Sequence, residues 1–95
     1  MGILSASISS IILLVEKRNI VGIRVRQARK AAKPPITQSD LIARLQLLDM
    51  NIDQSGLSKI ENGQRPVSDM EVVALAKALK VTEEWLIKGT RNLPV

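Results

Sequence analysis

Apolar residues recur along this chain at intervals of three and four, which is the spacing of side chains on one face of an α-helix. The spacing is clearest in two stretches, Leu41, Leu45 and Leu48 in the first and Val72, Leu75, Ala76 and Leu79 in the second. No stretch alternates apolar and polar residues for long enough to form a half-buried strand. The pattern therefore predicts an all-α protein.

Capping and breaking residues divide the chain after residue 20 into five predicted helices. The first runs over residues 21–32 and stops before Pro34-Pro35, because proline lacks the amide that a helix needs. Thr37, Asp53, Ser68 and Thr82 each precede a polar or acidic first turn and are predicted N-caps. The third predicted helix spans 54–61 or 54–62, and the last spans 83–88, before Gly89.

Single residues are assigned from the same pattern. Ile23 is expected in the core stripe of the first helix, with the arginines of that helix turned outward. Asn51 is expected to take the left-handed conformation in the turn before the third helix. The predicted core also includes Met50, Met70, Trp85 and Leu86.

A separate apolar stripe precedes this set of helices, with Leu4, Ile8, Ile11 and Val15 at helical spacing. The unbroken apolar run from Ile11 to Val15 is much shorter than the roughly 20 residues of a membrane span, and no basic region precedes it. Neither a signal peptide nor a membrane anchor is therefore favoured. We expect residues 1–18 to form an amphipathic extension that associates with a second chain, and residues 19–95 to form the main domain.

Charge is distributed unevenly along the sequence. The net charge is +5, and residues 17–33 contain seven basic residues and no acidic one, whereas seven basic residues face eight acidic ones from residue 34 onward. A localised positive surface suits an anionic partner such as a nucleic-acid backbone, although such a run also serves as a solvated helix face. The chain has no Cys, His or Tyr. The sequence therefore predicts neither an enzyme nor a metal site, and it indicates no cofactor; the absence of cysteine fits a reducing cytoplasm.

Two motifs indicate a DNA-binding helix-turn-helix. Thr37-Gln38-Ser39-Asp40-Leu41 opens one helix, and Leu57-Ser58-Lys59-Ile60-Glu61-Asn62-Gly63-Gln64-Arg65 closes the next. Over residues 20 to about 88 the chain resembles the Cro/phage-repressor family of transcriptional regulators. The resemblance implies a compact five-helix, lambda-repressor-like DNA-binding domain. Eleven residues separate Leu45 from Leu57, more than in the common pattern of the family, so a longer second helix or a looser turn is expected.

Candidate DNA contacts lie around the third helix, whose first turn is Gln54-Ser55-Gly56. Glutamine can pair with adenine through two hydrogen bonds, serine can bond several bases, and glycine leaves space for close approach. The resemblance places Gln54, Ser55, Ser58 and Lys59 at the DNA and Gln38 at a phosphate. Asn62 and Arg65 suit backbone contacts from the following loop. Glu61 is instead expected to form an internal ion pair with Arg44 or an arginine of the first helix.

The sequence thus predicts a sequence-specific bacterial or phage-type transcriptional regulator that binds operator DNA as a homodimer. Two alternatives remain open. One is a protein-interaction module of the same fold, such as an antitoxin or antirepressor. The other is a membrane-peripheral module that uses the N-terminal stripe and the basic run to bind anionic lipid.

Overall fold

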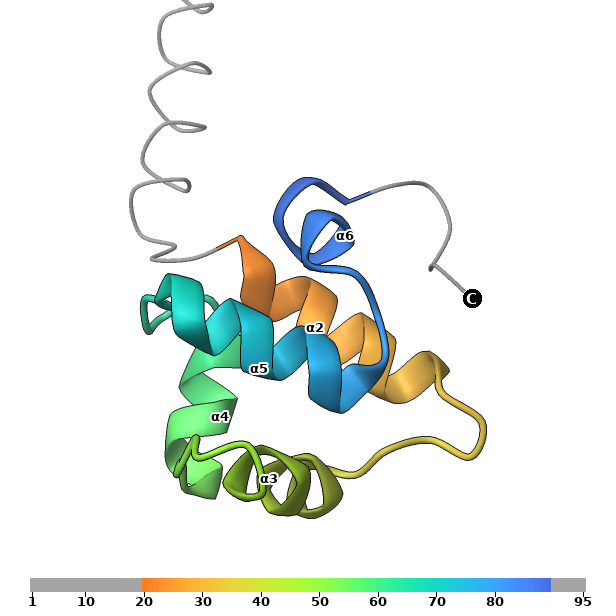
Figure 1. Cartoon of the computed structure of the whole chain (residues 1–95), viewed down its shortest axis with the longest axis vertical. Coiled ribbons are helices and arrows are strands. Elements are labelled where there is room, and N and C mark those ends of the chain that lie inside the picture. The colour runs from red at the N-terminus through yellow and green to blue at the C-terminus, as the bar shows by residue number, and fades with distance from the viewer. Residues whose placement is uncertain (1–19, 90–95) are drawn as a thin grey trace, which may run out of the picture.

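The computed structural model describes residues 20–89, and within this part of the chain it contains five α-helices and no strand (Figure 1). The helices are α2 (Val21–Ala31), α3 (Gln38–Gln46), α4 (Gln54–Glu61), α5 (Asp69–Leu79) and α6 (Glu83–Lys88). The all-α, five-helix prediction is confirmed for these residues. The helix and the association predicted for residues 1–18 lie outside the described residues.

Local hydrogen bonds explain where the helices begin. The Thr37 hydroxyl accepts the Asp40 amide at 3.0 Å while the Asp40 carboxylate accepts the Thr37 amide at 3.2 Å, and Ser68 and Glu71 form the same reciprocal pair at the start of α5. Asp53 and Thr82 cap α4 and α6. All four predicted N-caps are confirmed, because short polar side chains satisfy backbone amides that have no partner inside the helix.

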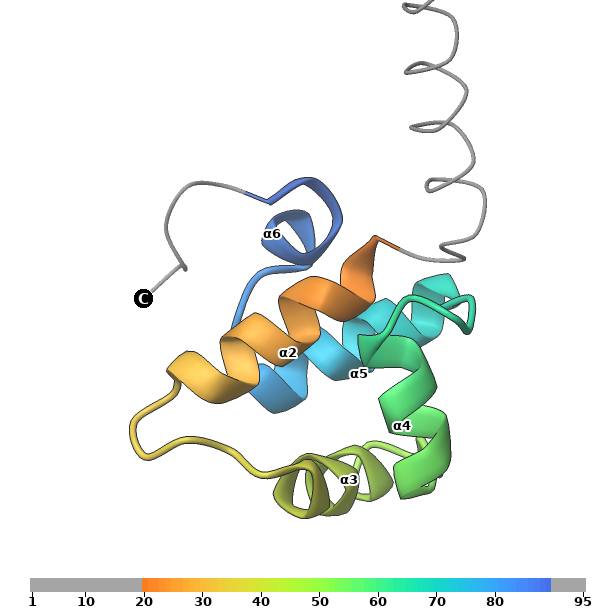
Figure 2. The same cartoon turned by 180° about the vertical axis from the view of Figure 1, so that it is seen from behind.

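The helices pack around one core, with α2 and α5 side by side in the middle of the domain (Figures 1 and 2). α3 and α4 lie on one side of this pair, below it in Figure 1, and α6 lies on the other side, above it. Each of the five helices supplies at least one fully buried side chain. These side chains are Val25 of α2, Leu41 and Leu45 of α3, Leu57 and Ile60 of α4, Leu75 of α5 and Leu86 of α6. Each such side chain removed from water contributes about 1.5–3 kcal/mol. Because these residues lie far apart in sequence, their burial joins the five helices in one core.

α2 buries a different face from the one that we predicted. Val21, Val25 and Ala28 are buried, whereas Ile23 is 44% exposed. Two positions along a helix turn the side chain by more than half a turn, so Ile23 cannot share a face with Val21 and Val25. Apolar residues lie on both faces of this helix, and periodicity alone does not identify the one that packs.

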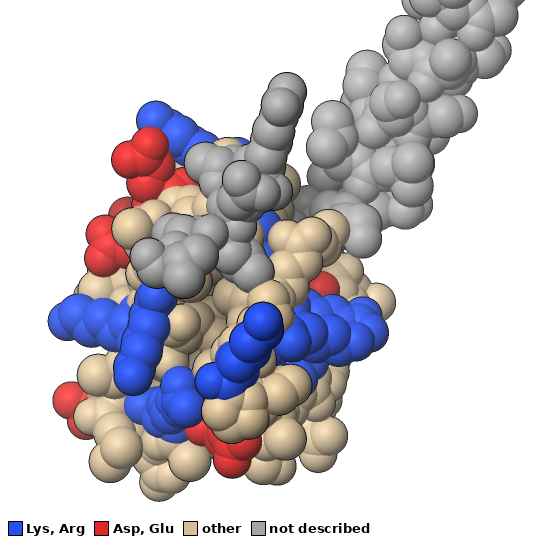
Figure 3. All heavy atoms as spheres, turned by 90° about the vertical axis from the view of Figure 1, so that its right-hand side faces the viewer, with Lys and Arg blue, Asp and Glu red and all other residues tan. Residues whose placement is uncertain are grey.

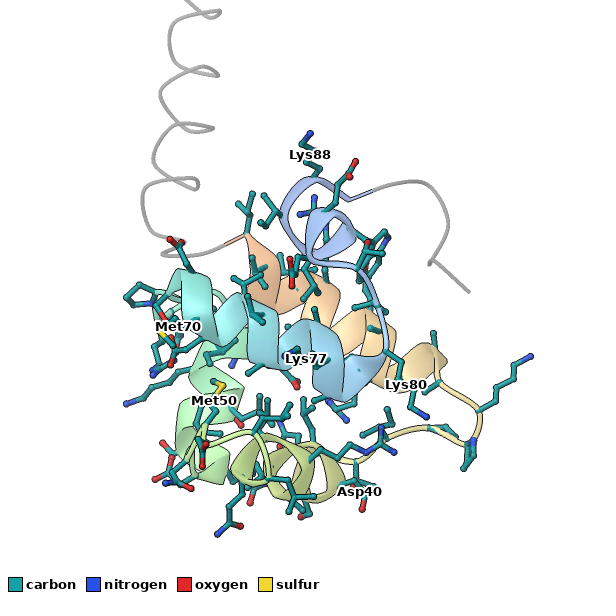
Figure 4. All side chains as sticks on the ribbon, viewed as in Figure 1. Asp40, Met50, Met70, Lys77, Lys80 and Lys88 are labelled. Carbon is teal, nitrogen blue, oxygen red and sulfur yellow. The ribbon has the colours of Figure 1, made fainter. Side chains whose placement is uncertain are left out.

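Of the two predicted core methionines, one is buried and the other is exposed (Figure 4). Met50 is 8% exposed, as predicted, and Met70 is 83% exposed, so that prediction is wrong. Met70 lies in the first turn of α5, ahead of the buried stripe that begins at Val72. Trp85 is 4% exposed and packs in the core, as predicted.

The arginines of α2 are not all turned outward. The Arg24 guanidinium donates to the carbonyl oxygens of Leu86 at 3.0 Å and Ile87 at 2.8 Å, so it caps the C-terminal end of α6. Gly89 follows with a φ of 71°, and a side chain there would overlap the Arg24 guanidinium. This contact fixes α6 to α2 through carbonyl groups that the helix itself leaves without a donor.

Candidate nucleic-acid interface

The α3–α4 pair forms the centre of the candidate interface, and its inner side chains fix the angle between the two helices. Leu41 and Leu45 of α3 and Leu57 and Ile60 of α4 are all fully buried. The Asp53 carboxylate accepts the Gly56 amide at 2.7 Å, which starts α4 directly after the turn. The first turn of α4 is left at the surface, since Gln54 and Ser55 are both exposed.

The additional residues between Leu45 and Leu57 form a turn after α3 and do not lengthen the helix itself. α3 ends at Gln46, and the amides of Leu48 and Met50 both donate to the Leu45 carbonyl at 2.9 Å. The left-handed residue is Asp49, with a φ of 62°, so the prediction for Asn51 is wrong. Aspartate tolerates this conformation as asparagine does, and burial of the adjacent Met50 in the core fixes where the reversal occurs.

Gln38 joins the two helices through its side-chain amide. Its nitrogen donates to the Ser58 hydroxyl at 3.3 Å and to the Glu61 carboxylate at 3.4 Å. Its oxygen accepts the Gln54 side-chain amide at 3.3 Å. The structure therefore brings three of the predicted contact residues, Gln38, Gln54 and Ser58, into one hydrogen-bonded group at the surface.

A buried ion pair supports this group from below. The Arg29 guanidinium donates to both Glu61 carboxylate oxygens at 2.9 Å, and the two side chains are only 12% and 4% exposed. Arg29 also donates to the Ile36 carbonyl at 3.1 Å. The predicted pairing of Glu61 with an arginine of the first helix is confirmed; Arg44, the other candidate, donates to the Ala78 carbonyl instead. The pair connects α2 to α4 where Gln38 also contacts Glu61.

Two basic residues that were not among the predicted DNA contacts lie beside the group formed by Gln38, Gln54 and Ser58. Arg26 and Lys30, one turn apart on α2, line a shallow hollow of about 320 Å³ together with Gln38, Ser58 and Asn62. Both side chains are exposed. Their spacing of four within the acid-free run was the available signal, because it places them on one face of a helix. A cationic wall therefore flanks the polar group.

The remaining predicted contacts lie around α4 in two directions. Lys59 and Asn62 are exposed on its outer side. Gly56 and Arg65 line a second hollow, beside Ile52. A Cβ on Gly56 would lie 2.8 Å from Ile52 Cγ1 and 3.0 Å from an Asp53 carboxylate oxygen. The absence of a side chain at Gly56 therefore serves the packing of the turn against α4.

Arg65 pairs with Glu71 of α5 at 2.8 Å. Partial burial raises the pKa of Glu71, but the hydrogen bond and charge of Arg65 and the bonds from Ser68 outweigh it, so the net pKa lies below the ordinary 4.5. The pair connects the loop after α4 to the first turn of α5. Arg65 thus has a structural partner in addition to its predicted role at DNA.

Within residues 20–89 no three His, Cys, Asp or Glu side chains come together in an arrangement that could hold a metal ion. None of the helices in this region is both long enough and apolar enough to span a lipid bilayer.

Comparison with known proteins supports the assignment that the geometry suggests. The model of the Helix-turn-helix family matches residues 25–86, which include all five helices in whole or in part. Comparison with curated proteins and with solved structures gives no match. The match covers well over half of the chain and contains the α3–turn–α4 unit with its exposed first turn. The chain therefore belongs to the lambda-repressor-like helix-turn-helix family of DNA-binding regulators.

Proposed function

We propose that this protein is a sequence-specific transcriptional regulator in which α4 enters the major groove of operator DNA. The observation that carries the proposal is the hydrogen bond between Gln54 and Gln38 at the exposed start of α4. A glutamine amide held in position loses less conformational entropy when it pairs with a base than a mobile one does. The adenine edge in the major groove offers the acceptor and donor that such an amide matches.

The surrounding side chains are proposed to hold the DNA backbone. Arg26 and Lys30 supply positive charge beside Gln38, and Lys59 and Asn62 extend the polar surface along α4. Contacts to phosphates fix the register of the protein without reading sequence. We keep Ser55 and Ser58 as base or phosphate contacts and Arg65 as a backbone contact from the loop after α4. We keep Gly56 as a position of close approach to the major groove, in addition to its packing against Ile52.

The proposal is tested by comparing Gln54→Ala with Gln27→Ala. Gln27 is an exposed glutamine of α2 that lies outside the hollow lined by Arg26 and Lys30. A preferred site is first selected from a random duplex library, and fluorescence anisotropy then measures affinity for this site and for a scrambled duplex. Gln54→Ala should weaken binding to the preferred site by about 1–3 kcal/mol and leave the scrambled duplex nearly unaffected. Gln27→Ala should change neither.

Two results would contradict this assignment. Equal losses on the preferred and scrambled duplexes would make Gln54 a backbone contact or a folding residue. No binding to any duplex at low salt would leave this fold as a protein-interaction module.

We further propose that the regulator acts as a homodimer. One short recognition helix reads only a few base pairs, and two-fold pairing over half-sites about 34–36 Å apart extends the site. The apolar stripe at Leu4, Ile8, Ile11 and Val15 is proposed to supply the association.

Sedimentation of the full chain and of residues 19–95 at equal concentration tests the dimer. Loss of residues 1–18 should shift the protein toward monomer without unfolding the helices α2 to α6, because the core from Val21 to Leu86 is complete without them. A truncated protein that stays dimeric would place the interface elsewhere, and α6 is then the next surface to examine.

A further inference from the structure

A third hollow lies away from the first turn of α4, between the C-terminal ends of α2 and α5. It has a volume of about 770 Å³ and is bounded by the connector that contains Pro34 and Pro35. Clefts that bind small organic ligands have volumes of roughly 300–1,000 Å³. This groove is therefore large enough for a small molecule.

The groove exists because the residues around it are short or rigid. Ala28, Ala31 and Ala32 present only methyl groups from the last turns of α2. The two prolines then carry the chain away from the helix axis, since α2 cannot continue through them. Ala28, Ile36 and Leu79 are each less than 8% exposed and form an apolar floor.

The rim of the groove is cationic. Lys33, Arg44 and Lys80 border it, and Asp40 is the one acidic residue among those that line it. The Asp40 carboxylate already accepts the Thr37 amide. Within the described residues neither the Lys33 side chain nor the Lys80 side chain forms a hydrogen bond or an ion pair. Figure 3 shows the molecule from this side, with several Lys and Arg side chains exposed on the surface.

Lys80 occupies an unusual position for a lysine. It is the C-cap of α5 and has a φ of 59°, in the left-handed region where glycine is the ordinary residue at a helix end. A side chain there costs backbone energy that glycine would not. Figure 4 shows Lys80 at the end of α5 next to the connector, while Lys77 lies one turn earlier on the same helix. A residue other than glycine in this conformation is an outlier from which a role for its side chain can be hypothesised.

We propose that this groove binds a small organic carboxylate with an apolar body. The apolar floor takes the hydrocarbon part, and Lys33 and Lys80 hold the carboxylate at the rim by charge-assisted hydrogen bonds. The charge of the rim excludes a cationic ligand of the same shape.

The ligand would not compete with DNA for the helix-turn-helix surface. Asp40 and Arg44, one turn apart, share the flank of α3 that faces the groove. Gln38 and Ile42 lie on the other flank, toward α4. The site therefore does not depend on the proposed reading of operator DNA, and its test needs no operator.

The test uses the full chain labelled with ¹⁵N, with decanoate as the probe and decyltrimethylammonium as a cation of the same chain length. Decanoate should shift the amide signals of Ala31, Ala32, Ile36 and Val81 in a saturable manner, and the cation should not. Lys80→Gly should weaken decanoate binding by about fivefold or more, as expected for loss of one charge-assisted contact. Lys77→Ala, which removes one charge from the exposed side of the same helix, should change the affinity by less than about twofold.

Thermal melts of the two variants separate binding from folding. Lys80→Gly should melt no lower than the parent protein, because glycine adopts the left-handed conformation without strain. Weaker binding by a variant that folds at least as well would thus assign the loss to the lysine side chain.

Other occupants of the groove would be recognised by different results, each of which overturns the proposal. Equal binding of the cation, or shifts centred on the exposed Ile20, Ile23 and Ile87, would mean that the probe coats apolar surface. Shifts of the groove amides that grow with protein concentration alone would assign the groove to a second copy of the chain. Shifts of the same amides on addition of a random DNA duplex would make the rim part of the nucleic-acid surface.

Discussion

The Arg29–Glu61 pair is expected to behave as a buried ion pair whose two members cannot be removed separately. In the parent protein the Arg29 side chain is 12% exposed and the Glu61 side chain is 4% exposed. Glu61→Leu removes the two carboxylate bonds of Arg29, and Arg29→Met removes the cation that faces Glu61. Breaking such a pair by loss of one partner costs about 3–5 kcal/mol. A loss of this size approaches the whole free energy of unfolding of a small domain.

The double variant Arg29→Met with Glu61→Leu should be more stable than either single variant. No uncompensated charge remains in it, and apolar side chains fill the space. Its residual cost should be about 1–2 kcal/mol, because the Ile36 carbonyl loses the donor that Arg29 supplies at 3.1 Å. The coupling between the two positions should therefore exceed about 2 kcal/mol.

Urea denaturation followed by circular dichroism measures all four proteins of this cycle. Arg65 and Glu71 provide a matched control, since they form an ion pair at similar distance whose side chains are 36% and 23% exposed. The control cycle should give a coupling of about 1 kcal/mol or less. Additive losses at Arg29 and Glu61 would refute the reasoning and would mean that water reaches the pair.

Two further predictions concern single residues of the loop and helix that follow α4. Gly63→Ala should lower the free energy of unfolding by about 1–2 kcal/mol, because Gly63 is buried with a φ of 74°; unchanged stability in urea would mean that the loop accepts another backbone conformation. Glu71→Gln keeps an acceptor for the helix cap and removes the charge that Arg65 stabilises. Because the pKa of Glu71 is lowered on folding, its charge stabilises the protein above the unfolded value near 4.5 and ceases to do so as the pH falls through the lowered value. The stability difference between parent and variant should therefore be present at neutral pH and shrink in acid, and a difference that is the same at every pH would contradict this origin.

Helix positions were predictable from the sequence because they depend on short-range signals. Thr37 and Ser68 hydrogen-bond residues three positions along the chain, so the sequence alone contains both partners. Gln38 and Ser58 came from the resemblance as separate DNA contacts, which stay predictions. The hydrogen bond between their side chains was not predicted, because the two residues lie twenty positions apart in sequence.

The wrong predictions for Ile23 and Asn51 have a different cause. In each of them two residues were equally suitable on local grounds, and tertiary packing decided between them. Ile23 and Val25 are equally apolar, and only the packing of α2 against α4, α5 and α6 decides which of them is buried. Asp49 and Asn51 can both adopt left-handed backbone, and the burial of Met50 decides between them. The groove next to Lys80 involves residues more than forty positions apart, so no local pattern could have revealed it.

The contact between Arg24 and the end of α6 has a consequence for how this domain can be joined to others. By fixing α6 to α2, it places the start of α2 and the end of α6 on the side of the molecule opposite α3 (Figure 1). A polypeptide fused before α2 or after α6 would therefore leave from the side that does not face the proposed DNA. Such an arrangement lets a sensing or assembly module be gained or exchanged at either terminus during evolution without obstructing the recognition helix.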